Sequence, residues 1–597
     1  MDMNANKYKL LQLLVVSLIV SGAVLFLSYA SDLSLGSPAP LATLFVGVGF
    51  LSVGSALLYV SVSEEHSEFF IVLLYLLALT LLLQNSFRFE VLSGADNLWE
   101  YRVARDTLMI FRWPTPAVGT GQMFSSYYSS LAISIFPAIM AEISGMNLVF
   151  TFQFIFNILG ASIPVLLFLV TRRALGEIKV AALASILYTQ SEYFIQNIPT
   201  HIKMMISLIF LLLVLLVIFE NTPQRRMGSL TFHFLSFIFM FGIIVSHYYV
   251  VYFSIALFLA LAIVPFLVKW LPKKLATMLK LENPAFAGAK SISTGYLFFS
   301  FIVLTFSWFI FGVPWLFNQN INMAKQAFLS LVERKGSLLI VQYNPLTFQP
   351  RGPIVSYWFV LLILLSYIAL LYFWLRVPKD AKHVLWVSAG TALAFVFFLI
   401  LLVPGVTNFL SPERAALMAN LFLYSFLAIV ILACVKSLRK SRLRMLIECI
   451  LIVFVVMNLV VNLRIPAYQN MILYNGSSSI PIEERLTQAY NTKGGLVLSE
   501  WISSNLASDE LISTDARGFS ELFYSDNAIV TVITPKFAND SSFLALPYYY
   551  VTDNVWVVAP GTPGTLVVLK VNMTTDIFSI SNKIFDDGEY SLLARTK

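Results

Sequence analysis

The chain has 597 residues, of which 58% are hydrophobic and 12% are charged, and its mean hydropathy is +0.80. A soluble chain carries about 25% charged residues, so this composition excludes a soluble enzyme, a disordered chain, a coiled coil and a disulfide-stapled secreted module. The apolar residues come in long uninterrupted runs, which indicates a polytopic membrane protein.

The apolar runs predict thirteen membrane spans, because a helix needs about 20 apolar residues to cross a bilayer. We therefore expect an all-α membrane domain over residues 1–463, with the two ends of the chain on opposite sides of the membrane. The expected spans are 9–29, 41–62, 69–85, 149–171, 178–196, 201–219, 229–246, 248–268, 296–314, 354–375, 384–403, 415–435 and 445–463.

The net charge of +7 combines two opposite populations. Residues 1–463 carry 30 Lys and Arg against 18 Asp and Glu, whereas residues 464–597 carry 9 against 14. With the N-terminus inside, 20 basic residues of the membrane part lie in cytoplasmic segments and 10 on the other side. The positive-inside rule therefore predicts a multi-pass plasma-membrane protein with a cytoplasmic N-terminus. Because the basic excess belongs to the cytoplasmic loops of the membrane part, we expect no nucleic-acid partner.

The first outer segment, residues 85–147, is too long to be a simple connector. It carries Asp96 and Glu100, whose spacing of four places both carboxylates on one face of a helix. Such a pair is able to act as a general base or to hold a divalent cation, Mg²⁺ or Mn²⁺. The alternative is a hydrated loop whose charges pair locally with little gain in stability.

Further charged residues follow the acid pair in the same segment. Arg102 and Arg105 are candidates to bind a phosphate through charge-assisted hydrogen bonds, and Asp106 is an accessory candidate. The apolar run that follows is short and is interrupted by Pro137. We therefore expect this run to lie in the outer interface rather than to cross the membrane.

Two accessory candidates lie at later outer turns. Glu192 precedes the sixth expected span, and His247 stands between the seventh and the eighth. An isolated charge at a membrane edge is often simply solvated, and the tyrosines after His247 are equally typical of an aromatic belt. Both interpretations stay open for each residue.

Arg414 lies at the outer end of the expected span 415–435. An arginine there is able to hold a lipid phosphate through two parallel hydrogen bonds, or to reach the interface merely as a solvated side chain. The chain has no P-loop, no CxxC and no HExxH motif. Nucleotide-driven transport and a zinc hydrolase of familiar type therefore lack support.

Residues 464–597 have a different composition, with the β-rich runs AIVTVIT, VWVVA and TLVVLKV bounded by Gly, Pro, Asn and Asp. This pattern predicts a small extracytoplasmic α/β domain. The segment also contains three N-x-S/T glycosylation sequons, which agrees with an outer location. They begin at Asn475, Asn539 and Asn572.

Three stretches resemble the GT-C superfamily of polyprenyl-phosphate-sugar-dependent glycosyltransferases, which includes protein mannosyltransferases and oligosaccharyltransferase catalytic subunits. They are the Asp-x-x-x-Glu-Tyr motif that starts at Asp96, then YYSSLAISIFPAIMAEISG, then IFNILGASIPVLLFLVTRRALGEIKVAALASILYTQSEYF. Within the superfamily, the chain is most similar to a group of uncharacterised archaeal membrane proteins.

The resemblance implies an active site on the outer face, a sugar donor linked to a polyprenyl phosphate in the membrane lipid, and a glycan, protein or lipid acceptor. Asp96 matches the family's acid in the first loop and Glu100 the second acid of the pair. Arg414 matches an arginine that contacts the carrier phosphate, with Arg102 or Arg105 as helpers. The tail lacks a WWY-type motif, which argues against en bloc transfer to asparagine, and the resemblance leaves the need for a divalent cation open.

Two other classes of function remain as alternatives. A lipid-carrier transporter or flippase predicts charged residues at mid-depth, paired between repeated halves, whereas the expected spans are nearly free of acids there. A non-catalytic cell-surface assembly protein would use its tail to organise partners. The polar residues gather at the outer ends of the spans, which favours an enzyme.

Overall fold

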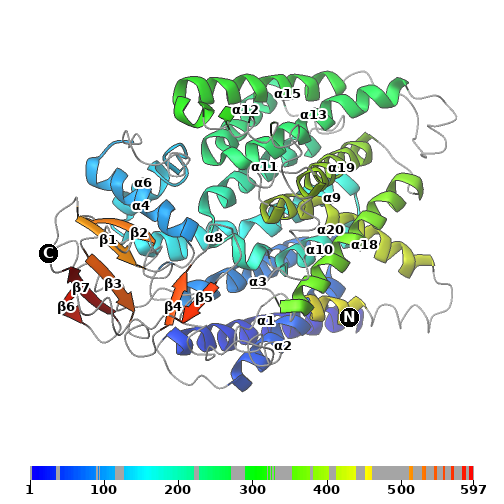
Figure 1. Cartoon of the computed structure of the whole chain (residues 1–597). Helices are drawn as coiled ribbons and strands as arrows, with labels where there is room; N and C mark the ends of the chain where they lie inside the picture. Colours follow the sequence, from blue (N-terminus) through cyan, green and yellow to red (C-terminus); the bar gives the residue numbers. More distant parts are fainter. Residues whose placement is uncertain are drawn as a thin grey trace.

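The computed structural model shows a bundle of long helices and a set of short strands near the C-terminus (Figure 1). The bundle is built from the apolar segments that the sequence predicts, and its core consists of their buried side chains. The residues that the structure describes are 3–34, 41–88, 92, 95–113, 127–191, 193–220, 228–270, 290–318, 321–322, 325, 329, 352–376, 381–402, 412–437, 451–459, 510–514, 528–532, 543–547, 555–558, 567–570, 581–586 and 590–595.

Some helices pack against sequence neighbours, as α1 does on α2, and others pack against distant elements, as α13 does on α19 and α10 on α20. Three π-helical segments, η1, η2 and η4, interrupt or follow α-helices. The helical elements are α1 (Met3–Ser34), α2 (Leu41–Ser61), α3 (Ser67–Arg88), α4 (Ala95–Ile110), α6 (Ile135–Ser144), α7 (Leu148–Phe150), η1 (Thr151–Ile155), α8 (Phe156–Gly160), α9 (Ser162–Leu175), α10 (Ile178–Thr189), η2 (Tyr193–Asn197), α11 (Ile202–Glu220), α12 (Ser229–Ser246), α13 (Tyr248–Trp270), α15 (Lys290–Ser307), η4 (Trp308–Gly312), α18 (Gly352–Arg376), α19 (Ala381–Leu402) and α20 (Pro412–Ser437).

Among the described residues, seven helical segments are long and apolar enough to cross a membrane, so the chain is a multi-pass membrane protein. Helices also occupy the other expected spans, but the count of thirteen and the orientation stay predictions. The seven segments are Lys9–Tyr29, Thr43–Ser61, Ser67–Gln84, Leu148–Leu175, Ile202–Glu220, Gly295–Gly312 and Arg414–Val435.

In its described part, the expected outer segment contains the helices α4 and α6. The ten residues of α6 rise about 15 Å, which is half of a bilayer core, and Pro137 lies in its first turn. This length agrees with the prediction that the run does not cross the membrane. The helix ends at Gly145, whose φ of 65° is a left-handed conformation that glycine adopts without strain.

One end of the bundle, which we call the α4 end, holds the C-termini of α12 and α15 and the N-termini of α11, α13 and α20, as the contacts below show. The opposite end is closed by ion pairs. Arg172, at the end of α9, pairs with Glu64, and Arg173 Nε lies 2.6 Å from Glu220 Oε2. Lys382 Nζ donates to the carbonyl of Arg173 at 3.2 Å. Charged side chains therefore join α9, α11 and α19 at this end.

The helix that carries Arg414 is fixed by a buried polar contact. Trp386 of α19 is fully buried, and its indole Nε1 donates to Ser425 Oγ of α20 at 2.8 Å. The same indole packs on Phe422 with ring centroids 4.6 Å apart. This contact sets the position of α20 along α19.

The described part of the tail consists of strands. The runs predicted as strands are β2, β4 and β5, and a five-stranded sheet has the order β2-β1-β3-β7-β6. The pairs β1–β2 and β1–β3 are parallel, whereas β3–β7, β6–β7 and the separate pair β4–β5 are antiparallel. The strands are β1 (Glu510–Thr514), β2 (Ala528–Val532), β3 (Phe543–Pro547), β4 (Val555–Val558), β5 (Val567–Lys570), β6 (Ser581–Asp586) and β7 (Tyr590–Arg595).

The strands agree with the prediction for the tail, but its helical part and the boundary at residue 464 are not tested. The expected amphipathic helix around Trp501 and the three sequons lie outside the described residues. The α/β class and the extracytoplasmic location of the tail therefore stay predictions.

Glycines let α1 and α2 approach closely, as small residues do at many helix contacts in membranes. A Cβ at Gly22 would lie 2.9 Å from the backbone nitrogen of Leu51, and a Cβ at Gly47 would lie 2.9 Å from that of Phe26. Backbone atoms cannot move aside as side chains do, so these positions admit only glycine.

Substitution of Gly47 by valine should destabilise the protein by about 1–3 kcal/mol, the usual cost of overpacking. Gly49 lies two residues further along the same helix, on roughly the opposite face, and a Cβ there would meet nothing within 4 Å. Gly49→Val is therefore the matched control, expected to stay within about 0.5 kcal/mol once the gain in helix propensity that both variants share is subtracted. Thermal unfolding of both variants in detergent measures the difference, and equal midpoints would contradict the close contact.

Candidate functional site

Glu100, the second acid of the pair, lies in α4 and is fully buried. Its Oε2 accepts a hydrogen bond from the backbone N–H of Ile202 at 2.8 Å, and its Oε1 lies 3.7 Å from Lys203 Nζ. Lys203 is itself only 2% exposed. The amide of Ile202 belongs to the first turn of α11, where backbone N–H groups lack partners within the helix. Glu100 therefore caps α11 and neutralises a buried ammonium group.

The segment after α4 completes the surroundings of Lys203. The ammonium nitrogen lies 3.3 Å from the centroid of the Tyr127 ring, a cation–π geometry. Trp99 of α4 packs on the same ring with centroids 6.2 Å apart. Asn97 Nδ2 reaches the carbonyl of Pro199 at 3.5 Å. The first turns of α4 are thus joined to the segment that leads into α11.

The residues that follow Tyr127 are fixed on the end of α12. Ser130 Oγ donates to the carbonyl of Ser246 at 2.5 Å, and the backbone N–H of Leu131 donates to the carbonyl of Val245 at 2.8 Å. These bonds join segments more than 100 residues apart in the chain. They place Tyr127 and α4 beside the junction between α12 and α13.

His247 occupies that junction and caps α13. Its Nδ1 accepts the backbone N–H groups of Tyr249 and Val250 at 3.1 and 3.3 Å. Because a backbone N–H only donates, Nδ1 carries no proton, and the neutral ring has its proton on Nε2. The ring also stacks on Tyr248, with centroids 5.2 Å apart and planes at 8°. These contacts are those of a helix cap rather than of a general base.

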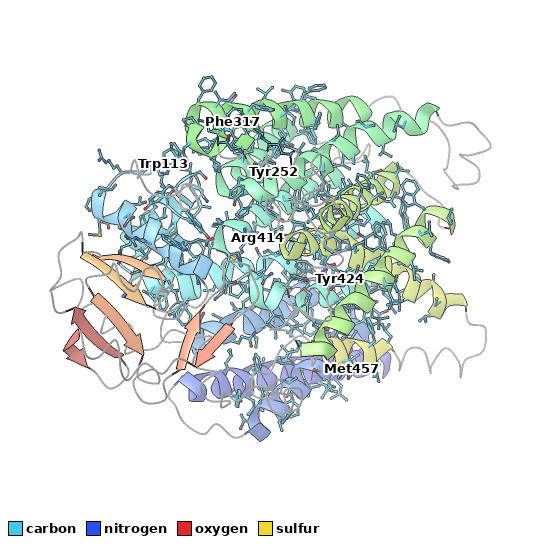
Figure 2. All side chains as sticks on the ribbon, in the orientation of Figure 1. Trp113, Tyr252, Phe317, Arg414, Tyr424 and Met457 are labelled. Atoms are coloured by element: carbon cyan, nitrogen blue, oxygen red, sulfur yellow. The ribbon has the colours of Figure 1, made fainter. Side chains whose placement is uncertain are left out.

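Arg414 meets the same junction from α20. Its guanidinium carbon lies 5.8 Å from the centroid of the Tyr249 ring, and His247 packs edge-on against that ring at 6.0 Å. Arg414 is half-buried, whereas Tyr249 is 1% exposed. Figure 2 shows Arg414 at the start of α20 and Tyr424 further along the helix. Arg414 is therefore held at the α4 end by an aromatic face and stays partly accessible.

The second half of α4 forms a charged cluster with Tyr128. The phenol of Tyr128 donates to Asp106 Oδ2 at 3.0 Å. Burial, together with the adjacent Asp106 carboxylate, raises the pKa of Tyr128 to about 12, while Arg102 and Arg105 act in the opposite direction. The phenol therefore keeps its proton, and its bond to Asp106, throughout the physiological pH range.

The sequence predictions have different outcomes at this site. The backbone of Asp96 lies in the first turn of α4, one turn before Glu100, but its side chain is not described, and Glu192 lies outside the described residues. The contacts above link α4 to the helix junction that Arg414 meets, while a pocket shared by Asp96, Glu100 and Arg414 stays a prediction. The alternative of a hydrated loop does not hold for Glu100, because Glu100 is buried against Lys203.

Sequence reasoning missed the residues that hold the site together. Lys203 begins an apolar helix, a position at which a lysine normally reaches the interface. Tyr127 and Tyr128 begin one of the stretches that carry the family resemblance, but no role was expected for either residue. The sequence did contain one signal for the buried ion pair: Lys203 lies at the start of an expected span, and Glu100 lies within an aromatic-rich segment.

The residues present do not favour a divalent cation bound by Asp96 and Glu100. Both oxygens of Glu100 already face positive partners, the Ile202 amide and the Lys203 ammonium. No group of three or more His, Cys, Asp and Glu residues is close enough to hold a metal within the described part of the chain. A cation at Asp96 stays a prediction, and it would need ligands other than Glu100.

No protein-family model and no curated protein matches the chain. Solved structures do match it. The archaeal oligosaccharyltransferase AglB from Archaeoglobus fulgidus, in complex with an inhibitory peptide and a dolichol-phosphate, is 12% identical with a TM-score of 0.49, over 86% of this chain and 75% of that chain. The apo form of the Archaeoglobus fulgidus oligosaccharyltransferase matches at 12% and 0.49, over 85% and 74%. ArnT from Cupriavidus metallidurans, bound to undecaprenyl phosphate, matches at 11% and 0.48, over 89% and 98%.

AglB and ArnT are both GT-C membrane glycosyltransferases, the superfamily that the sequence resembles. At these identities and TM-scores, the likeness carries over no activity, substrate or site residue to this chain. The functional case therefore depends on the residues described above.

Breaking the buried pair should be costly, because it leaves one charge buried without its partner. We expect Lys203→Met to destabilise the protein by about 3–5 kcal/mol, and Glu100→Gln by a similar amount. The double variant keeps an acceptor for the Ile202 amide and leaves no buried charge, so it should regain most of that loss. Thermal unfolding of the three variants completes a double-mutant cycle, and additive losses would show that the two side chains do not interact.

A second pair of variants separates the capping role of His247 from other roles. Asn is a favoured residue at a helix N-cap, so His247→Asn should stay within about 0.5 kcal/mol of the parent protein. His247→Leu removes the acceptor and should cost about 1–2 kcal/mol. Unfolding midpoints measured under identical conditions test the assignment, which fails if the two variants are equally stable.

Proposed function

We propose that the chain is an integral-membrane glycosyltransferase that moves a sugar from a polyprenyl-phosphate-linked donor to an acceptor hydroxyl. The α4 end of the bundle would face the outside of the cell, as the distribution of basic residues predicts. The acceptor would be a glycan, a protein or a lipid.

The observation that supports this proposal best is a continuous series of contacts between α4 and Arg414. It runs from Glu100 to Lys203 and Tyr127, through Ser130 to Ser246, and through His247 and Tyr249 to Arg414. The series joins residues separated by more than 300 positions in the sequence. The series links an acid-bearing helix to a half-buried arginine at the same end of the bundle, which is the arrangement that a reaction between a lipid phosphate and a water-soluble acceptor would need.

The transfer needs one base and one cation at the phosphate. The oxygen of the acceptor hydroxyl attacks the anomeric carbon of the donor sugar as Asp96 takes the hydroxyl proton. The bond between that carbon and the phosphate oxygen breaks, and its electron pair leaves with the polyprenyl phosphate. Arg414 stabilises the negative charge that develops on the phosphate, through two N–H groups in the plane of the guanidinium.

Glu100 has a positioning role in this mechanism. Its carboxylate is bound to Ile202 and Lys203, which fixes the register of α4 on α11. Asp96 lies one helical turn before Glu100 on the same helix. The buried pair therefore sets where the backbone of Asp96 lies, while the proton transfer is left to Asp96.

The distribution of buried charge supports an interfacial reaction over transport. Among the described residues, Glu100 and Lys203 are the only buried members of the Asp, Glu, Lys and Arg classes. They lie beside helix termini at the α4 end rather than at mid-depth. A transporter that moved a charged lipid head through the bundle would be expected to bury charge along the spans.

Removal of either reacting group should abolish most of the transfer. We expect Asp96→Asn and Arg414→Gln each to lower kcat by about 10²-fold or more, because each removes an interaction that acts at the transition state. Purified protein in vesicles is supplied with dolichyl- or undecaprenyl-phosphate-linked radiolabelled hexose and a cell-surface extract as acceptor. Release of label from the lipid phase measures the transfer.

Arg173→Gln is the matched control, because it removes a half-exposed arginine with an ion pair at the opposite end of the bundle. Its transfer rate should be unchanged. Full transfer by Asp96→Asn would remove Asp96 from the role of base, and failure of the parent protein to release label from any lipid-linked hexose would refute the proposed reaction.

A further inference from the structure

The C-terminal end of α4 exposes an apolar surface that the proposed reaction does not use. Met109, Ile110 and Phe111 are 61%, 46% and 81% exposed. Arg112 follows them and is also exposed. We call residues 109–112 the α4 tip. Three consecutive exposed apolar side chains are unfavourable in water and mark a surface that binds something apolar.

The backbone at the α4 tip holds Phe111 outward. Its φ is 49°, and it is the one non-glycine residue with a positive φ among those that the structure describes. This position, just after the last turn of a helix, is usually occupied by glycine or asparagine. A bulky residue in this conformation is strained, and such strain persists where the side chain has a use.

The base of the tip is attached to the end of a membrane span. Trp113 stacks on Trp308 with ring centroids 5.7 Å apart and planes at 14°, and its indole N–H donates to the carbonyl of Tyr128 at 2.8 Å. Trp308 begins η4, directly after α15 in the span Gly295–Gly312. Trp113 also packs on Trp315, with ring centroids 6.2 Å apart, and Figure 2 labels it on the same side of the bundle as Phe317, which follows η4. The tip therefore lies at the height where this span leaves the membrane.

The span to which the base of the tip is attached presents an apolar surface on α15. Phe299, Val303, Phe306 and Ile310 are all at least 43% exposed, and their spacing places them along one face of the helix. A span whose exposed face is apolar presents that face to lipid. Phe311, at the end of this face, is 83% exposed in the same segment as Trp308.

We propose that the α4 tip inserts into the boundary between headgroups and acyl chains of the leaflet at the α4 end, with Arg112 among the lipid phosphates. Met109, Ile110 and Phe111 provide the apolar part that such an interfacial anchor needs, and Arg112 provides the charge that favours anionic headgroups. The anchor fixes the far end of the helix that carries Asp96. It is independent of whether sugar transfer takes place.

Lipid-borne quenchers test the proposal on the full chain in vesicles. With Cys434 and Cys449 replaced by serine, one cysteine at a time is introduced and labelled with a polarity-sensitive fluorophore. Phe111→Cys is compared with Val303→Cys, a lipid-facing reference in α15, and with Glu65→Cys, an exposed reference in the turn after α2. Spin-labelled lipids carry the quencher either near the headgroup or near the end of the acyl chain.

An anchored tip predicts quenching of the label at position 111 about three-fold or more above the label at 65, with the headgroup-proximal quencher acting more strongly than the deep one, because interfacial segments insert about 5–10 Å. Quenching equal to that at position 65 would place the tip in water and overturn the proposal. A label shielded from both lipid-borne and water-soluble quenchers would show that protein covers the tip, and would overturn it as well. Neither result depends on transfer activity, so each is distinguishable from a failure of the proposed reaction.

Discussion

The site depends on one buried ion pair, between Glu100 of α4 and Lys203 of α11. Two charges removed from water gain stability only when they are close and their remaining hydrogen-bonding groups are satisfied. Here the carboxylate also accepts the Ile202 amide, and the ammonium group lies over the Tyr127 ring. Hydrophobic packing alone would allow α4 to slide along its neighbours, whereas this pair fits only in one register. The position of every other residue on α4 follows from it.

The π-helical segments η1, η2 and η4 of the described chain lie near α4 and its flanking loop. Phe152 of η1 packs edge-on against Tyr101 with centroids 5.8 Å apart, Trp308 of η4 stacks on Trp113, and η2 ends shortly before the carbonyl that Asn97 contacts. A π-helical turn widens the helix and frees a carbonyl, and such turns are frequent at functional sites. In η1 the carbonyl of Gln153 accepts both Ser86 and Asn157. Local widening of three helices thus accompanies the docking of the loop.

Long apolar runs were sufficient to predict helices in the membrane part, and β-rich runs bounded by turn residues were sufficient for β2, β4 and β5. These elements depend on local sequence patterns, and the structure places helices and strands within the residue ranges that those patterns predicted. The environment of Glu100 could not be predicted in the same way, because its partner lies 103 residues further along the chain and looks like an ordinary interfacial lysine. A spacing of four indicated a shared helical face for Asp96 and Glu100, but not which residue that face would meet.

The role of His247 shows the same limit. A histidine at a helix end, next to three tyrosines, fits a catalytic group and an aromatic belt equally well as a sequence. Only the two backbone amides that meet Nδ1 decide that it caps α13. Long-range contacts therefore determine the chemistry of residues whose local structure is predictable.

The separation in sequence of the groups at the α4 end has a consequence for biosynthesis. The loop that carries α4 emerges from the ribosome long before Lys203, Ser246 and Arg414, the residues that it and its neighbours contact. Until α11 and α12 have been inserted, the carboxylate of Glu100 has no ammonium partner, and the loop has no surface on which to dock. The α4 end is therefore complete only after α20 has been synthesised and inserted beside the earlier helices.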